Sequence, residues 1–283
     1  MKKETGSAST RRREEDHSQA LLRLINETAH RWSPHQVFSD FVEMACLALS
    51  NAVDRGQYEA REARYLEIVG KYPREDVDRF PRMLGQLTLA LEQCCLTGEM
   101  DDVLGKVYMQ AELGNDRTGQ FFTPFEISRL MAGLQVGDGA HLRERGFIDL
   151  LEPTCGAGGM VIAIAEALQH AGFNYQRAMH ATCIDIDARC AHMTYLQLSL
   201  LHIPAIVLHG NSLTDEVWSR WYTPAHVLGG WRRRLAERRA REPIPVQVQV
   251  NEPLEDPPRG EKAVQPQSTA ALRMVGQLKL FED

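Results

Sequence analysis

The chain has 283 residues, of which 43% are hydrophobic and 25% are charged, and its formal net charge at pH 7 is −6. This composition is that of an ordinary globular protein, which excludes a collagen, a disulfide-rich miniprotein and a wholly disordered chain. The length allows one large domain or two modest ones. The best apolar run, Met160–Ala165, is far shorter than the roughly 18 apolar residues of a transmembrane helix, so no membrane span is expected.

The cysteines and the first residues indicate the compartment. The chain has six cysteines, none with CxxC spacing, which is typical of reduced thiols in a cytoplasm. The first residues are charged and no apolar segment follows them, so no secretory signal is expected. The net negative charge means that a nucleic-acid partner would need a local basic patch.

The first part of the chain is predicted to be helical. Residues 1–17 are polar, charged and aperiodic, which predicts a disordered tail. Between 18 and 113 apolar residues recur at helical spacing, as in the stripe Phe38, Phe41, Ala45, Ala48 and Ala52. Ser33 before Pro34 is typical of a helix N-terminus. By itself this helical segment indicates no function.

From about residue 119 to 213 the rhythm changes. Short apolar runs, which predict buried strands, alternate with amphipathic helices. The expected strands are Phe147–Leu151, Ala178–Ile184 and Ala205–Leu208, and the helices between them are Gly158–Ala171 and Asp187–His202. This order predicts an α/β fold with a parallel sheet and right-handed crossovers.

Beyond residue 240 the chain is rich in proline. Six of the thirteen prolines lie between Pro243 and Pro266. The Val-Gln alternation at Val246–Val250 is compatible with a lone strand, but the flanking prolines favour an extended tether. The predicted division of the chain is therefore a disordered tail, a helical domain, a sheet domain and a proline-rich flexible tail, with the boundaries 1–17, 18–113, 114–240 and 241–283.

A glycine-rich turn is the sharpest chemical signal. The sequence EPTCGAGG, from Glu152 to Gly159, follows the first predicted strand and opens a helix. Glycines allow a tight turn and a close approach to a ligand, and the helix N-terminus offers unpaired N–H groups to a carboxylate or phosphate. No lysine follows at the spacing of a P-loop, which disfavours that site.

Two polar residues end the next two strands. Asp185 ends the second predicted strand, where an acid suits the hydroxyl groups of a ribose. Asn211 follows the third strand, where an amide oxygen can accept from an adenine amino group. With the glycine turn they predict a nucleoside-cofactor pocket at the carboxyl edge of the sheet. The alternative is that both side chains only cap turns.

Four motifs in order carry a resemblance to a known family. They are GQFFTP (Gly119–Pro124, before a helix from Phe125), EPTCGAGGM, CIDID and HGNSL. Together they closely resemble the modification subunits of bacterial type I restriction–modification systems, which are adenine-N6 DNA methyltransferases. The segment Asp102–Tyr108 also resembles the family's stretch before its first cofactor motif, so the resemblance covers about residues 101–213.

The resemblance implies a Rossmann-like, S-adenosylmethionine-dependent core, and it assigns residues to the cofactor. Phe122, Thr123 and Pro124 match the motif at the methionine end of the cofactor. Asp185 matches the acid that binds the ribose, and Asn211 stands near the adenine ring where the family usually has Asp. The glycine loop around the amino-acid group corresponds to Glu152, Pro153, Thr154, Gly156 and Gly158.

The catalytic motif of the family, Asn/Asp-Pro-Pro-aromatic, follows the fourth strand of the family's fold, and it is not found in the chain after Leu213. The nearest echo is Thr223–His226, which lacks the second proline and an amide side chain. Asp256–Arg259 has the right first three letters but no preceding buried strand, and we interpret it as coincidence. The catalytic residues are therefore unknown: transfer uses another acceptor, or the chain binds the cofactor without methylating.

Weaker patterns allow two interpretations each. Aromatic residues after the third strand either stack a flipped base or belong to the core: Trp218, Trp221, Tyr222 and Trp231. The stretch Trp231–Arg241, with six arginines, is a helix that either neutralises DNA phosphates or is a solvated face. His180, Cys183, Cys190 and His192 superficially resemble zinc ligands, but a strand and helix at this spacing indicate core packing, and no metal is expected.

The sequence QLKLF (Gln277–Phe281) resembles the short peptide by which bacterial replication and repair proteins bind the DNA sliding clamp. The alternative is a hydrophobic segment that folds back on the domain. The leading expectation is an S-adenosylmethionine-binding, adenine-N6 DNA methyltransferase-like protein of the cytoplasm, with DNA and a specificity subunit as partners. The second is a catalytically inactive cofactor-binding module that docks on DNA machinery through this tail.

Overall fold

The computed structural model describes residues 16–111 and 122–241. The described residues up to Arg234 belong to one compact unit, and the described residues from Leu235 to Arg241 belong to a second one. Within the first unit, the helices that precede residue 111 and the sheet share one continuous hydrophobic core. The domain boundaries expected from the sequence stay a prediction.

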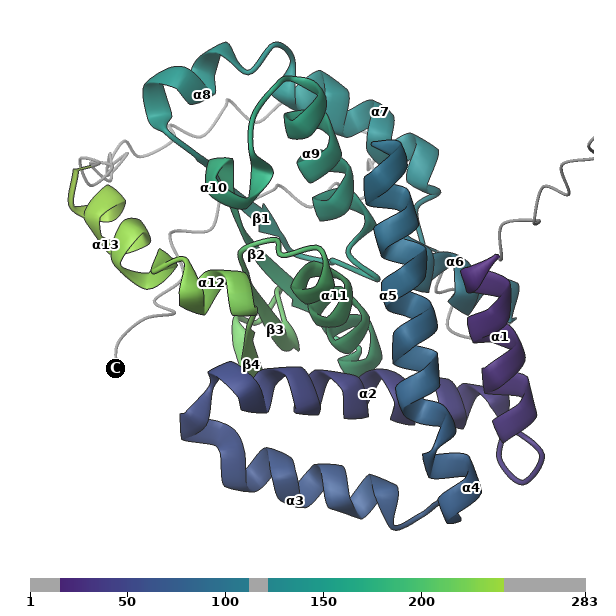
Figure 1. Cartoon of the computed structure of the whole chain (residues 1–283). Helices are drawn as coiled ribbons and strands as arrows, with labels where there is room; N and C mark the ends of the chain where they lie inside the picture. Colours follow the sequence, from purple (N-terminus) through teal and green to yellow (C-terminus); the bar gives the residue numbers. More distant parts are fainter. Residues whose placement is uncertain (1–15, 112–121, 242–283) are drawn as a thin grey trace, which may run out of the picture. The chain divides into compact units, whose positions relative to one another are not determined.

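The first part of the described chain is helical, as the sequence predicts (Figure 1). The Ser33 hydroxyl accepts a hydrogen bond from the Gln36 amide at 3.1 Å and Pro34 is the first helical residue, so the expected N-terminus is confirmed. The helices are α1 (His17–Thr28), α2 (Pro34–Val53), η1 (Arg55–Gln57), α3 (Tyr58–Val69), α4 (Arg74–Val77), α5 (Arg79–Thr97) and α6 (Val103–Gln110).

Four strands form one sheet in the order β1-β2-β3-β4. The first three are parallel, which confirms the predicted α/β fold, and β4 pairs antiparallel with β3. The remaining elements are α7 (Phe125–Val136), α8 (Ala140–Arg145), β1 (Ile148–Glu152), α9 (Gly159–His170), α10 (Tyr175–Ala178), β2 (Met179–Asp185), α11 (Ala188–Leu200), β3 (Ala205–Asn211), β4 (Glu216–Tyr222), α12 (Pro224–Leu228) and α13 (Trp231–Arg241).

The strand register brings the carboxyl ends of three strands together. Glu152 pairs with Cys183, and Asp185 pairs with His209, so the last residues of β1, β2 and β3 lie at one edge of the sheet. Right-handed crossovers in one direction put α9 and α11 on the same face of the sheet, as Figure 1 shows. The loops that follow β1, β2 and β3 therefore meet at this edge.

The first two predicted strands begin and end one residue too early, since β1 is Ile148–Glu152 and β2 is Met179–Asp185, and one strand was missed. Phe147 precedes β1, and its ring packs edge-on against Trp231 with centroids 5.0 Å apart. Ala178 belongs to the short helix α10, not to β2. The third strand extends to Asn211, three residues beyond its predicted end, because Asn211 pairs with Glu216 of β4. This fourth strand was missed.

The predicted stripe on α2 was wrong in its second half. Phe38, Phe41 and Ala45 are buried, but Ala48 and Ala52 are exposed. The physical reason is that α2 packs against α1, α3 and α11 at once, so its buried face is wider than one stripe and turns along the helix.

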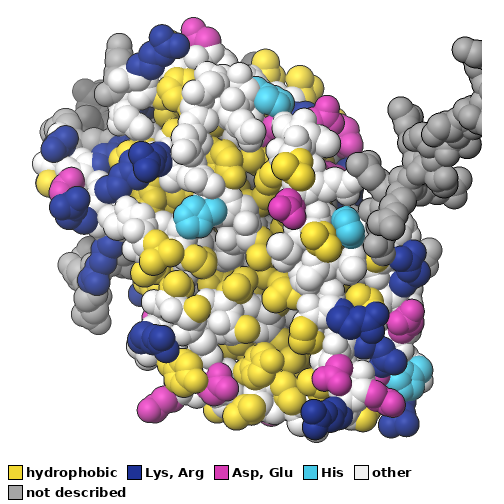
Figure 2. Space-filling view, in the orientation of Figure 1, with side chains coloured by type: hydrophobic (Ala, Val, Ile, Leu, Met, Phe, Trp, Pro, Cys, Tyr) yellow, Lys and Arg dark blue, Asp and Glu magenta, His cyan; other side chains and the backbone are white. Residues whose placement is uncertain are grey.

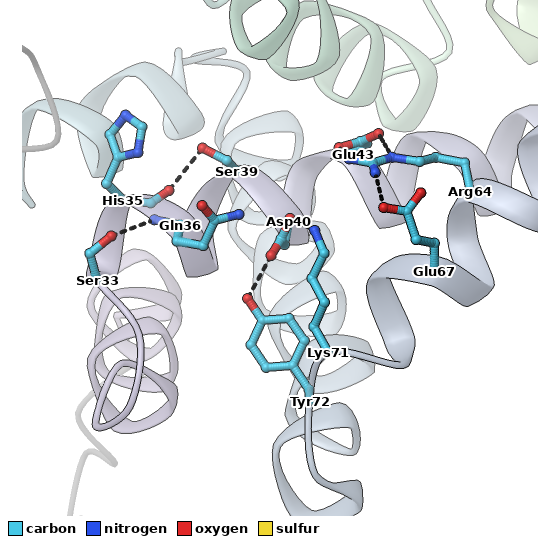
Figure 3. A network of polar contacts seen from close by, with 10 residues as sticks. All are labelled: Ser33, His35, Gln36, Ser39, Asp40, Glu43, Arg64, Glu67, Lys71 and Tyr72. Carbon is cyan, nitrogen blue, oxygen red and sulfur yellow. Dashed lines mark hydrogen bonds and ion pairs between the residues drawn. The ribbon is translucent and has the colours of Figure 1, made fainter.

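Polar contacts fix α2 against α3 and the loop after it (Figure 3). The Arg64 guanidinium donates to both carboxylate oxygens of Glu43, at 2.6 and 2.9 Å, and to Glu67 at 2.8 Å. The Tyr72 hydroxyl donates to Oδ2 of Asp40 at 2.7 Å, and Asp40 is almost fully buried. A guanidinium that donates to both oxygens of one carboxylate, as Arg64 does to Glu43, is a strong form of ion pair. This contact helps to fix the angle between α2 and α3.

The outer surface of these helices carries both signs of charge. Figure 2 shows acidic and basic side chains mixed at the lower right, where α1 and α4 lie in Figure 1. Among residues 16–111 and 122–241, no helix is long and apolar enough to cross a membrane.

The Tyr72 hydrogen bond predicts a stability loss. Tyr72→Phe leaves the buried Asp40 carboxylate without its hydroxyl donor, and the free energy of unfolding should fall by about 2 kcal/mol. Urea denaturation of the two proteins measures the difference. The matched control is Tyr65→Phe on α3, whose hydroxyl bonds none of the described residues and whose loss should cost little. Equal effects of the two substitutions would contradict the assignment.

Candidate functional site

The glycine turn lies between β1 and α9 and needs glycine at two positions. Gly156 has φ +54° and Gly158 has φ +95°, which other residues rarely adopt. A Cβ on Gly156 would lie 3.1 Å from the Phe122 ring, and one on Gly158 would lie 3.2 Å from Oγ1 of Thr194. The turn is thus held between the segment before α7 and helix α11.

Asp185 ties this turn to the end of β2. Its Oδ2 accepts a hydrogen bond from the Gly156 amide and its Oδ1 accepts one from the Asp187 amide, both at 2.9 Å. Burial raises the pKa of Asp185 above its ordinary value, while the two amides oppose that rise. Each oxygen keeps a further lone pair, so the carboxylate can still accept from a ligand.

Asn211 lies at the end of β3, beside Asp185. Its Oδ1 accepts from the Leu213 amide at 3.0 Å, so it caps the turn that follows the strand. The sequence offered capping and ligand binding as alternatives for Asp185 and Asn211. Both side chains cap turns, and both also line the same cavity.

A cavity of about 560 Å³ opens at this edge of the sheet, within the usual range for small-molecule sites. Eight of the ten predicted cofactor residues line it: Phe122, Thr123, Glu152, Pro153, Thr154, Gly156, Asp185 and Asn211. The other two lie nearby and do not line it. Pro124 precedes α7, and Gly158 precedes α9 with its backbone against Thr194.

Sequence reasoning missed several lining residues, chiefly Asp102, Ser128, Ile186, Cys190, Ser212 and Leu213. Asp102 begins the segment Asp102–Tyr108, whose resemblance to the family was noted. An acidic residue directly before a helix is also typical of a helix N-cap, and this signal was not used. Burial raises the pKa of the Cys190 thiol far above its ordinary value, so Cys190 lines the cavity as a neutral group.

The segment before α7 contributes an aromatic wall. The Phe122 ring packs against Tyr108 with centroids 5.4 Å apart and faces Gly156. Thr123 and Pro124 are exposed. The first three residues of GQFFTP, Gly119–Phe121, lie outside the described residues.

The nearest echo of the catalytic motif lies at the opposite edge of the sheet. The Thr223 hydroxyl donates to the Ile203 carbonyl at 3.0 Å, and the Ala205 amide donates to that hydroxyl at 2.9 Å, at the start of β3. His226 is buried and bonds His180 at 2.9 Å. The cavity lies at the other end of β3, about 20 Å away at the rise of a strand. Asp256–Arg259 lies outside the described residues.

The aromatic cluster after β3 is mostly core. Trp221 is buried, with the Arg61 guanidinium 4.6 Å above its ring, and Trp231 is buried against Phe147. Trp218 is half-exposed on β4. The arginine-rich stretch is the predicted helix, α13. The four residues that resemble zinc ligands are buried in the core: His180, Cys183, Cys190 and His192.

A second cavity, of about 680 Å³, lies between the α2–α3 pair and β4. Four of the charged side chains that line it are paired, Arg61 with Asp54 at 2.8 Å and Arg64 with Glu43 at 2.6 Å, and Arg220 also lines it. We therefore assign the ligand site to the cavity at the glycine turn, where polar groups are exposed to the interior.

Residues 99–228 match the family model for N-6 DNA methylases. The resemblance to N-6 DNA methylases is confirmed. The methylase-like stretch contains every described residue that lines the cavity at the glycine turn, from Asp102 to Leu213. A search of curated proteins finds no match to the chain.

Two solved structures are similar to this chain. One, from Listeria monocytogenes, is described as a class I S-adenosylmethionine-dependent methyltransferase; it is 16% identical over 70% of this chain and 54% of its own, with a TM-score of 0.36. The other is the methyltransferase subunit of a type I restriction–modification system from Streptococcus thermophilus, 11% identical over 66% of this chain and 57% of its own, with a TM-score of 0.31. The chain spans little more than half the length of either.

The conformation of Gly158 predicts a local stability effect. Gly158→Ala should lower the free energy of unfolding by about 1–2 kcal/mol, because alanine is strained at φ +95° and its Cβ would press on Thr194. Chemical denaturation measures the loss.

The matched control is Gly133→Ala within α7, where a Cβ meets nothing within 4 Å. It should stabilise the protein by about 0.5–1 kcal/mol, because alanine is the better helix former. A neutral or stabilising Gly158→Ala would contradict the strained turn.

Proposed function

We propose that this chain binds S-adenosylmethionine in the cavity at the glycine turn and that its reaction is methyl transfer to the N6 amino group of adenine in DNA. The observation that carries the proposal is the convergence of the glycine turn, Asp185 and Asn211 on one cavity. The family match over the same residues supports the class of reaction.

The residues of the cavity fit this cofactor by their charge. Among the described residues that line it, three carry carboxyl side chains, Asp102, Glu152 and Asp185, and none is a lysine or an arginine. S-Adenosylmethionine carries a sulfonium and an ammonium group, so an acidic cavity favours it over a phosphate-bearing nucleotide. Asp185 would hold the ribose hydroxyls, and Asn211 would lie toward the adenine.

The bound cofactor would supply an electrophilic methyl group on its sulfonium, and the protein would supply orientation. Phe122 and the loop of Gly156 would keep water from the methionine end, because the ring packs over the turn. Burial raises the pKa values of Glu152 and Asp185, so cofactor binding should weaken as acidification protonates them.

A specific observation favours a second function, cofactor binding without methyl transfer. The echo of the catalytic motif, Thr223–His226, lies at the opposite edge of the sheet from the cavity. An acceptor for the target amine is therefore not supplied by that motif. In this second function the domain would act as an assembly module on DNA machinery.

The partners follow from the proposed reaction. DNA is the proposed substrate, in the cytoplasm, and a specificity subunit is the proposed source of sequence recognition. Docking on the sliding clamp through Gln277–Phe281 stays a prediction, because these residues lie outside the described part of the chain.

Calorimetric titration of the full chain with S-adenosylmethionine tests the proposal. Asp185→Ala should weaken binding by about tenfold or more, because a carboxylate bonded to ribose hydroxyls is worth about 1.5–3 kcal/mol. The matched control is Glu126→Ala on α7, which is exposed and does not line the cavity, and its affinity should equal that of the parent. Absence of binding to the parent would refute the proposal.

Isotope-labelled cofactor with mixed DNA separates the two functions. Labelled N6-methyladenine supports the methyltransferase. Binding without transfer favours the cofactor-binding module, and labelling of RNA or protein alone would contradict DNA as the substrate.

A further inference from the structure

Asp102 lies at the N-terminus of α6 and is buried, with 6% of its surface exposed. Its Oδ1 accepts two hydrogen bonds, from the Gly105 amide at 2.9 Å and from the Gln197 side-chain amide at 2.7 Å. This oxygen caps the helix and joins it to α11. The capping role is therefore complete with one of the two carboxylate oxygens.

The second oxygen, Oδ2, faces the cavity. Asp102 lines the cavity, and a Cβ built on Gly159 would lie 3.2 Å from Oδ2, at the first residue of α9. A Cβ on Gly105 would meet the same oxygen. Two glycines from different helices therefore make room for this carboxylate oxygen at the cavity wall.

No described residue donates a hydrogen bond to Oδ2 or forms an ion pair with Asp102. The neighbouring cation, Lys106, instead bonds Asp101 at 2.6 Å. Burial raises the pKa of Asp102 above its ordinary value, while the hydrogen bonds from Gln197 and Gly105 oppose that rise.

The other two carboxylates among the described lining residues differ from Asp102 in their bonding or in their burial. Both oxygens of Asp185 accept from backbone amides, at 2.9 Å each. Glu152 is only partly buried, so water can reach its carboxylate. Among the described residues that line the cavity, Asp102 is thus the carboxylate that has an oxygen without a donor and is also nine-tenths buried.

We propose that Asp102 binds the α-ammonium group of the methionine moiety of S-adenosylmethionine through Oδ2. This inference rests on the proposed function. It adds to the glycine turn and Asp185 a third contact with the cofactor, made by Asp102. The ammonium group supplies the donor that Oδ2 lacks among the described residues, and this oxygen selects a cofactor that carries an amino acid. Asp102 thereby links cofactor recognition to the start of α6, upstream of the glycine turn.

The test compares two ligands on the full chain by calorimetry. S-Adenosylmethionine carries the ammonium group, whereas methylthioadenosine has the same nucleoside and no amino acid. Asp102→Asn keeps Oδ1 as the cap and replaces Oδ2 with an amide donor. It should weaken the affinity for S-adenosylmethionine by about tenfold or more and leave that for methylthioadenosine unchanged.

The matched control is Asp101→Asn at the neighbouring position, whose side chain is partly exposed and bonds Lys106. It should change neither affinity. Urea denaturation of each variant confirms that it is folded at the temperature of the titration.

Each outcome decides the inference. An equal loss for both ligands in Asp102→Asn assigns Asp102 a purely structural role and overturns it. An unchanged affinity for S-adenosylmethionine in the folded variant also overturns it and leaves the proposed function standing. A parent chain that binds neither ligand refutes the proposed function itself, and the inference with it.

Discussion

The side-chain amide of Gln197 is the interaction on which the candidate site depends. It is fully buried on α11, donates to Asp102 at 2.7 Å and to the Ala157 carbonyl at 2.8 Å, and accepts from the Leu104 amide at 3.0 Å. One side chain thus joins the start of α6, the glycine turn and the helix behind the sheet. A buried amide is stable only when its groups are bonded, so the three segments keep one arrangement.

The order of the parallel strands determines where the loops around the Gln197 amide lie. The sheet runs from β1 to β3 without reversing, so the loops after these strands lie in a row at one edge. Asp185 closes the row by bonding the glycine turn from the end of the next strand. Because the helical segment before residue 111 shares a core with the sheet, its Asp102 lines the cavity and its Tyr108 packs against Phe122 in the cavity wall.

Much of this arrangement could be predicted from sequence, and the limits have physical causes. The strand–turn–helix pattern and the acids at strand ends are local signals, so Gly156, Asp185 and Asn211 were found at the cavity. The strand β4 was missed because its aromatic residues face two surfaces, with Trp221 buried against side chains of α3 and α11 and Trp218 half-exposed. Alternation of that kind is decided by tertiary packing.

The role of Asp102 required the structure for a different reason. Its helix cap is a local feature, but its second oxygen reaches the cavity only because α6 packs on α11 and lies beside Gly159. These contacts join residues that are about ninety positions apart in the chain, for example Asp102 and Gln197. Periodicity carries no information about such contacts.

The most direct measurement is a crystal structure of the full chain with S-adenosylhomocysteine. The account predicts electron density for the ligand in the cavity at the glycine turn, its ribose hydroxyls on Asp185 and its amino group within hydrogen-bond distance of Oδ2 of Asp102. Density at another place, or a ligand in this cavity with its amino group directed away from Asp102, would contradict it.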